Sequence, residues 1–319
     1  MAGSAKGGLT LTVAAAAAFG TSGTFATALL TAGWSPAAAV ATRVAVAGLA
    51  LTIPAVRAMR GRWGAFKTEW WRVVAYGLIA VAGCQLCYFN ALRHLPVSIA
   101  LLLEYLASVI VVGWLWLRHR QRPRRLTVTG GIMSLAGLAM MVGVSGTGGI
   151  SLVGVLWGLL AAVCLAVYFT LSAADSQLPA LVTAWGGMCV GALALFLLGA
   201  TKVVSLRASF TDVTLLNHRV SWLVPILGVS LIAAAFAYVA GIAGAQRLGP
   251  RLASFASMAE VMFATLFAWI FLGQLPTPLQ FAGGALIFAG VILVRAGEPS
   301  AVEVPQPEPV PAEHGSVVV

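Results

Sequence analysis

Apolar segments of about twenty residues recur along this chain of 319 residues, and they limit what it can fold into. An α-helix rises about 1.5 Å per residue, so about twenty residues cross a hydrocarbon core of roughly 30 Å. Charged residues make up only 9% of the chain, whereas an ordinary soluble domain carries about 25%. The short alternating segments of a membrane β-barrel are absent from the sequence. We therefore expect an all-α integral membrane protein.

Gly, Pro and charged residues divide the apolar sequence into ten expected transmembrane helices. They cover residues 9–31, 37–56, 73–92, 97–117, 127–144, 151–172, 179–200, 222–245, 252–272 and 279–296. With a cytoplasmic N-terminus, 14 of the 19 Lys and Arg residues fall in cytoplasmic segments and Arg43 falls inside the second span. The four external ones are Arg93, Lys202, Arg207 and Arg219. The positive-inside rule then predicts a multi-pass protein of the inner (plasma) membrane with both termini in the cytoplasm.

Several function classes lack support in the sequence. The net charge of +10 lies beside the apolar segments rather than in a basic groove, which argues against nucleic acid as a partner. Cys84 and Cys87 form a CxxC pattern inside an apolar helix, without a second such pattern, so we interpret them as packing residues. We find no ATP-binding, zinc-protease or Ser/His/Asp motif. No enzyme activity, metal or cofactor is therefore predicted.

The sequence contains an internal repeat. LTVTGGIMSLAG at 126–137 matches LQFAGGALIFAG at 279–290, and ALRHLP at 91–96 matches AQRLGP at 245–250. We therefore predict two five-helix halves, residues 1–147 and 148–296, followed by a disordered cytoplasmic tail at 297–319. Five is odd, so the second half enters the membrane from the opposite side. Such inverted repeats are typical of secondary transporters, whose substrate site lies near the midplane between the repeats.

Only three ionisable residues lie well inside the expected spans: Glu104, Glu260 and Arg43. An ionisable residue in hydrocarbon is a functional-site candidate, because its burial is costly. Glu104 lies about 10 Å from the outer end of its span and Glu260 about 12 Å from the inner end, at 1.5 Å per residue. Both carboxylates are thus expected near the midplane, to bind protons or a substrate ammonium. The alternatives are a bond to a neighbouring helix for each Glu and, for Arg43, either a structural bond or a contact with a substrate carboxylate.

Polar and aromatic residues inside the spans complete the predicted substrate and proton site. Gln85 and Asn90 are polar residues on one span and are expected to face the interior. The aromatic candidates are Tyr88, Tyr105, Tyr168, Trp185 and Tyr238. Aromatic residues near span ends also serve as interface anchors, so both interpretations stay open for them. The hydroxyl-rich stretch FGTSGTFATALL, residues 19–30, fits either a cavity wall or close helix packing.

These residues resemble the EamA family of the drug/metabolite transporter superfamily. Arg43 in ATRVAVAGLAL resembles the family's arginine on its second helix, and FLGQLPTPLQFAGGALIFAGVIL resembles its closing signature, with Gln274 in place of Glu. IALLLEYLAS and RLGPRLASFASMAEV resemble the threonine/homoserine exporter-like branch, although Leu106-Ala107 and Val261 replace residues that are usually Gly-Pro and Pro there. The resemblance implies proton-coupled export of amino acids or similar metabolites.

The leading hypothesis is a secondary transporter that exports a small metabolite by alternating access, coupled to the proton gradient. A second hypothesis is a multidrug or lipophile exporter on the same scaffold. A third is a non-transporting membrane channel or scaffold. All three have the lipid bilayer as their surroundings, and the first two require a small-molecule substrate.

Overall fold

The computed structural model describes residues 2–61, 63–92, 94–95, 97–120, 122–142, 151–216, 218–272 and 275–297. The expectations for Arg93, for Gln274 and for the tail beyond residue 297 concern residues outside these ranges. Up to residue 142 the elements are α1 (Ala2–Gly20), α2 (Ser22–Thr31), α3 (Pro36–Ala58), α4 (Trp63–Ala75), the π-helix η1 (Tyr76–Gly83), α5 (Cys84–Leu92), α6 (Val97–Tyr105), α7 (Ala107–His119) and α8 (Arg125–Val142).

The remaining elements begin at residue 152. They are α9 (Leu152–Ser172), α10 (Ala180–Ala200), β1 (Val213–Leu215), β2 (His218–Val220), α11 (Leu223–Ser230), the π-helix η2 (Leu231–Phe236), α12 (Ala237–Leu248), α13 (Pro250–Ala256), α14 (Ala259–Leu272) and α15 (Pro278–Gly297). The antiparallel β1–β2 hairpin is an addition to the expected all-α fold. Its three-residue strands lie in the expected external segment between spans seven and eight.

Eight helical segments among the described residues are long and apolar enough to cross a membrane. They run over Lys6–Thr31, Pro36–Ala58, Trp63–Ala91, Ala100–Arg118, Leu152–Ser172, Ala180–Ala200, Leu223–Leu248 and Pro278–Gly297. The other two expected spans have a different form. One is the shorter apolar helix Arg125–Met141, and the other, residues 252–272, is interrupted at Ser257 and Met258 between α13 and α14.

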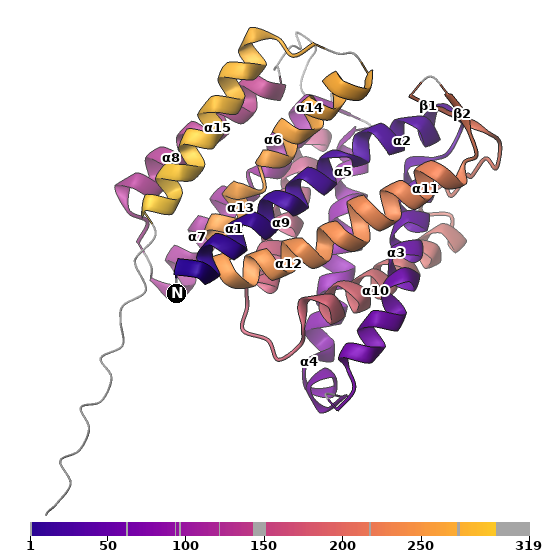
Figure 1. Ribbon diagram of the computed structural model, residues 1–319, viewed down its shortest axis with the longest axis horizontal. Helices are drawn as coiled ribbons and strands as arrows, with labels where there is room; N and C mark the ends of the chain where they lie inside the picture. The colour runs from indigo at the N-terminus through magenta and orange to yellow at the C-terminus, as the bar shows by residue number, and fades with distance from the viewer. Residues whose placement is uncertain are drawn as a thin grey trace, which may run out of the picture.

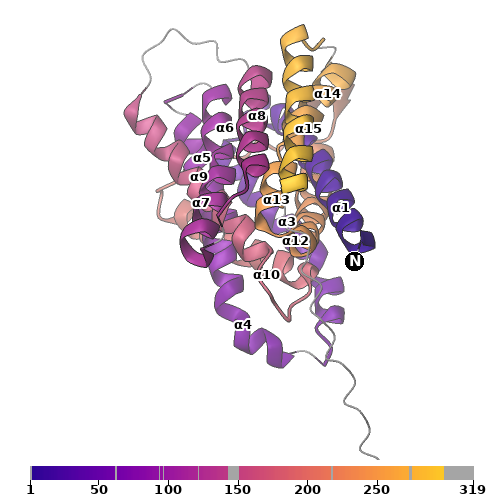
Figure 2. The same ribbon diagram turned by 90° about the vertical axis from the view of Figure 1, so that its left-hand side faces the viewer.

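Helices from the two expected halves pack against each other rather than forming two separate bundles. The main pairs are α1 with α12, α3 with α10, α5 with α9, and α8 with α15. Figures 1 and 2 both show α8 and α15 side by side along one edge of the bundle. A Cβ added at Gly130 or Gly137 would lie 2.5 Å from a backbone oxygen of α15, so the close approach of these two helices requires glycine at both positions.

The surface of the bundle is rich in large apolar side chains. Leu49, Ile53, Leu156 and Phe288 are each more than half exposed. Exposed apolar area of this extent is unusual for a protein in water and is the expected surface of one that contacts lipid tails. With the apolar helices, it identifies the chain as a multi-pass membrane protein.

The bundle has two ends with different structures. The β1–β2 hairpin lies at one end and α4 at the opposite end (Figure 1). Trp34, in the turn between α2 and α3, bonds the chain just before the hairpin, so this end is called the Trp34 end. The opposite end carries Glu69 on α4 and is called the Glu69 end.

Both candidate carboxylates lie next to irregular turns in their helices. The backbone N–H of Leu106 bonds the carbonyl of Leu103, three residues back, directly beside Glu104. The N–H groups of Met258 and Glu260 likewise bond carbonyls three residues back. Tight turns and π-helical segments inside longer helices often mark functional sites. At such turns the backbone departs from the regular α-helical hydrogen-bond pattern, beside residues that can line a cavity.

Candidate functional site

A buried cavity of about 120 Å³ lies in the middle of the bundle. Helices α1, α5, α6, α9, α12 and α13, together with η1 and the start of α14, contribute its lining. The lining residues are Thr12, Ala15, Ala16, Phe19, Ala80, Cys84, Gln85, Leu101, Glu104, Tyr105, Leu165, Tyr168, Phe169, Tyr238, Gly241, Ala253, Ser257 and Glu260. The cavity therefore combines both intramembrane carboxylates with residues from helices far apart in the sequence.

Each carboxylate accepts a hydrogen bond from a side chain on a neighbouring helix. The Cys84 thiol donates to Oε1 of Glu104 at 3.3 Å. The Tyr105 hydroxyl donates to Oε2 of Glu260 at 2.9 Å, and so joins α6 to α14. Because Glu104 and Tyr105 are neighbours on α6, the two carboxylates belong to one hydrogen-bonded region of the cavity wall.

Aromatic rings make up much of the remaining wall. The Tyr238 ring packs edge-on against Phe19 at 5.2 Å and against Tyr168 at 5.8 Å between ring centroids. Tyr168 in turn lies 5.6 Å from Tyr76, which is fully buried. Aromatic rings with polar tips suit a site that binds a partly apolar molecule and fixes it by a few polar contacts.

The charge of this cavity is one-sided. Among the described lining residues two are acidic and none is basic. Arg43, on α3, is buried at 8% exposure but does not line the cavity, and its Nε has no hydrogen-bond partner among the described residues. The cavity is therefore suited to a proton or an ammonium group, while Arg43 lies outside its lining.

Six of the ten predicted site residues share this cavity. They are Glu104, Glu260, Tyr105, Gln85, Tyr168 and Tyr238. Asn90 lines a second space of about 390 Å³ at the Trp34 end, here called the vestibule, together with Gln85. Its side-chain amide donates to the carbonyl of Leu86 at 2.8 Å.

Two predicted aromatic residues lie away from the cavity. The Trp185 indole donates to the Thr52 hydroxyl at 3.0 Å, and its ring packs with Met59 and Val73. Tyr88 packs beside the buried Cys84, Cys87 and Cys164. Packing is thus the observed role of these three cysteines, and Cys84 also bonds Glu104.

Sequence reasoning missed several lining residues. Thr12 and Ser257 carry hydroxyls inside apolar segments, which was a usable signal for both. The Thr12 hydroxyl is buried against Gly244 and has no hydrogen-bond partner among the described residues. Phe19 and Phe169 gave no such signal, because an aromatic residue in an apolar span is as compatible with packing as with a cavity wall.

The structure is a bundle of membrane helices around a buried cavity whose wall carries polar groups. This arrangement is typical of membrane transport proteins. Comparison with known proteins agrees with that class. The EamA-like transporter family matches residues 6–143 and 152–296, so the chain belongs to this family.

Relatives named as transporters cover most of the chain. It is 27% identical over 228 residues to "Uncharacterized inner membrane transporter YicL" of Salmonella typhimurium, covering 70% of this chain and 72% of that protein. It is 26% identical over 235 residues to "Uncharacterized transporter YwfM" of Bacillus subtilis, covering 71% and 74%. One solved crystal structure matches with a TM-score of 0.74 at 21% identity, over 91% of this chain and 96% of that one. That likeness concerns the fold alone.

Proposed function

We propose that this membrane transporter is a secondary exporter of amino acids or similar small metabolites, coupled to the proton gradient by alternating access. The observation that carries the proposal is that Glu104 and Glu260, from different helices, line one buried cavity that holds no basic residue among its described lining. A carboxylate in such a place is stabilised by a proton or by a cationic group of the substrate. Competition between the two couples proton movement to substrate movement.

In this proposal the two carboxylates have equivalent roles. An ammonium group of the substrate binds while a carboxylate is charged, and a proton that binds the carboxylate neutralises it and releases the substrate. Tyr105 orients Glu260 through its hydroxyl, and Tyr168 and Tyr238 bind the apolar part of the substrate. Arg43 has a structural role on α3 and does not contact the substrate, because it does not line the cavity.

The proposed architecture is ten membrane spans in two inverted five-helix halves, residues 1–147 and 148–296. Two matches to one family, over 6–143 and 152–296, support it. The helix pairs support it too, because α1 of the first half packs on α12 of the second, while α9 of the second packs on α5 of the first. The π-helices η1 and η2 occupy corresponding places. We further propose that the Glu69 end faces the cytoplasm, as the Lys and Arg distribution favours.

Flux measurements in proteoliposomes test this function. With a proton gradient imposed, Glu104→Gln and Glu260→Gln are each expected to lower substrate flux by about ten- to a hundredfold, because an amide neither binds a proton nor pairs with an ammonium. Asp212→Asn is the matched control, since Asp212 is exposed in the segment before β1 and lies away from the cavity. Its flux should equal that of the wild type. Unchanged flux in both Glu variants would contradict the mechanism.

Export of lipophilic cations is a second candidate, and a specific observation favours it. Much of the cavity wall is apolar or aromatic, including Phe19, Leu101, Leu165 and Phe169. Thermal shift with matched compounds separates the candidates, because a ligand that binds only the folded state raises its stability. Leucine, its decarboxylated amine and a bulky aromatic ammonium form a suitable set. Stabilisation by the aromatic ammonium alone would favour the second candidate.

A further inference from the structure

The floor of the cavity toward the Glu69 end is closed by tyrosine rings that pack edge-on or at a tilt. Tyr168 and Tyr238 line the cavity itself, and Tyr76 lies beneath Tyr168, fully buried. Below Tyr76 a space between η1, α9 and α10 measures only about 10 Å³. A single water molecule needs at least about that volume. Along this route, the described residues leave no space wide enough for a metabolite between the cavity and the Glu69 end.

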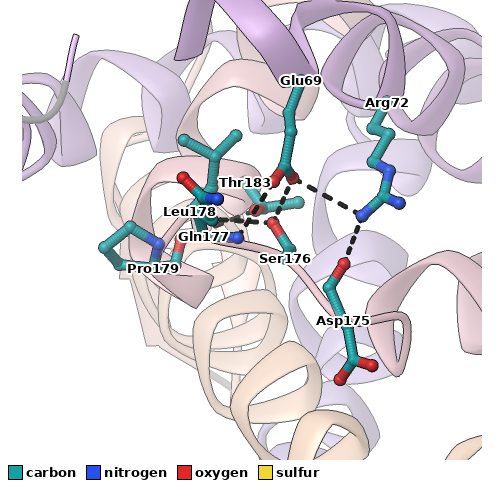
Figure 3. Close-up of polar contacts among 8 residues, drawn as sticks. All are labelled: Glu69, Arg72, Asp175, Ser176, Gln177, Leu178, Pro179 and Thr183. Carbon is teal, nitrogen blue, oxygen red and sulfur yellow. Dashed lines mark hydrogen bonds and ion pairs between the residues drawn. The ribbon is translucent and has the colours of Figure 1, made fainter. Parts of the chain in front are cut away.

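A polar cluster that includes Glu69, Arg72 and Ser176 lines that narrow space, and Figure 3 shows its contacts. A Glu69 carboxylate oxygen accepts a hydrogen bond from the Ser176 hydroxyl at 2.5 Å, and the other accepts from the Gln177 backbone N–H at 3.0 Å. Arg72, 3.5 Å from the Glu69 carboxylate, donates to the backbone carbonyl of Asp175. The cluster joins α4 to the segment between α9 and α10. In the expected architecture, α4 belongs to the first half of the chain and that segment belongs to the second.

The other side of the cavity is closed far less. Gln85 lines both the cavity and the vestibule of about 390 Å³ at the Trp34 end. One side chain therefore borders both spaces there, whereas Tyr168 and Tyr76 lie between the cavity and the narrow space at the Glu69 end. The structure corresponds to a state whose access, once Gln85 moves, is from the Trp34 end.

The helix that carries Glu69 also reaches the cavity. A single helical segment, Trp63–Ala91, contains Glu69, the buried Tyr76, and the cavity residues Cys84 and Gln85. Cys84 donates to Glu104. A change at the proposed carboxylate site is thus connected along one helix to the contact at Glu69. Charge-assisted hydrogen bonds suit a contact that must break and re-form, because they are strong only over a narrow range of geometry.

We propose that the contact of Glu69 with Ser176 and Gln177 is a lock that keeps the Glu69 end closed while the cavity communicates with the Trp34 end. This inference rests on the proposed transport function. The halves separate at the Glu69 end only after the carboxylate has released the 175–178 segment. The lock therefore sets the balance between the two states of the transporter.

Cysteine accessibility tests the lock in the full-length protein in lipid nanodiscs. Thr183→Cys places a reporter in the narrow space below Tyr76, and Val40→Cys, buried in the vestibule wall, reports on the Trp34 end. Labelling by a sulfonated maleimide is followed by peptide-resolved mass spectrometry, so the native cysteines stay in place. Adding Glu69→Gln is expected to raise the labelling rate of Thr183→Cys about tenfold and to lower that of Val40→Cys.

Asp175→Asn is the matched control for this test. Asp175 is exposed, and Arg72 bonds its backbone carbonyl rather than its carboxylate, so this variant removes a nearby negative charge without removing a bond. Both labelling rates should stay at their wild-type values. Ser176→Ala removes the hydroxyl that donates to Glu69 and should therefore also raise Thr183→Cys labelling. Equal melting temperatures among the variants show that opening, rather than unfolding, is measured.

The outcomes separate the lock from the transport function. Unchanged Thr183→Cys labelling in Glu69→Gln, or an equal rise in Asp175→Asn, would overturn the lock. Because labelling requires no substrate, it can succeed even if flux measurements on the Glu104 and Glu260 variants contradict the transport mechanism. Conversely, gradient-driven flux by the wild type together with unchanged Thr183→Cys labelling in Glu69→Gln would leave the transport proposal in place and reject the lock alone.

Discussion

At the Trp34 end an aromatic cluster joins two loops, whereas at the Glu69 end one carboxylate joins a helix to a loop. Trp34 is buried, its indole donates to the carbonyl of Ser209, and its ring packs against Phe210 and Trp222 at 5.9 and 6.0 Å. The Glu69 contact consists of hydrogen bonds to a carboxylate, with apolar side chains such as Val73 and Leu178 beside it. Aromatic packing tolerates small displacements, but hydrogen bonds to a carboxylate do not.

The difference suggests separate tasks for the two ends. The Trp34 cluster stabilises the fold at an end where the vestibule already leaves room beside the cavity. As the proposed lock, the Glu69 contact adds less to overall stability and controls the opening of its end. Stability and opening should therefore respond to different substitutions.

Trp34→Ala is expected to have the largest effect on stability. Removing a buried aromatic side chain from a packed cluster costs about 3–5 kcal/mol, because contacts are lost and a cavity is left. Thermal unfolding of the purified protein measures the loss. Trp116→Ala is the control, since Trp116 is 51% exposed on α7, and its melting temperature should change little. Equal losses in the two variants would show that the Trp34 cluster does not stabilise this end.

Gln85→Phe is expected to have an intermediate effect, on transport rather than on stability. The larger, apolar ring fills the point where cavity and vestibule meet, so substrate flux should fall about tenfold, the equivalent of about 1.4 kcal/mol in the barrier. Asn90→Phe is the control, because Asn90 lines the vestibule but not the cavity. If both variants lowered flux equally, Gln85 would hold no special place on the path.

Arg72→Ala is expected to have the smallest effect. Its ion pair with Glu69 is 3.5 Å long and its side chain is about one-third exposed, so solvent screens the interaction to below about 1 kcal/mol. Labelling of Thr183→Cys should rise only about two- to threefold, less than with Glu69→Gln, since Ser176 and Gln177 still bond the carboxylate. A rise as large as that of Glu69→Gln would assign the lock to the ion pair instead.

The sequence predicted the membrane character and the positions of most helices, because these follow from local hydropathy. It also predicted that Glu104 and Glu260 matter, since two lone carboxylates in apolar helices stand out against their neighbours. Both carboxylates line one cavity, and Tyr105 donates a hydrogen bond to Glu260. These arrangements depend on contacts between residues far apart in the chain. Composition and periodicity do not encode such contacts.

The interruptions of the helices also escaped prediction. The sequence was divided into ten uninterrupted spans, whereas the structure breaks residues 252–272 at Ser257 and Met258 and tightens the turn beside Glu104. No proline marks either place in this chain, and the hint that existed was the resemblance, in which the positions of Leu106-Ala107 and Val261 are usually Gly-Pro and Pro. Likewise, Trp185 and Tyr168 were equivalent candidates by residue type and depth, and only packing placed Tyr168 in the cavity wall and Trp185 against Thr52.

The sequence alone thus determined that this chain crosses a membrane many times and carries a few ionisable groups there, because burial free energy depends on each segment's own composition. Only the tertiary structure decided which of those groups meet, that Arg43 lies outside the cavity lining, and that one end is held by Glu69 while the other leaves a vestibule. Those outcomes depend on how side chains of distant helices fit together, and that fit is a property of the packed bundle rather than of any one segment.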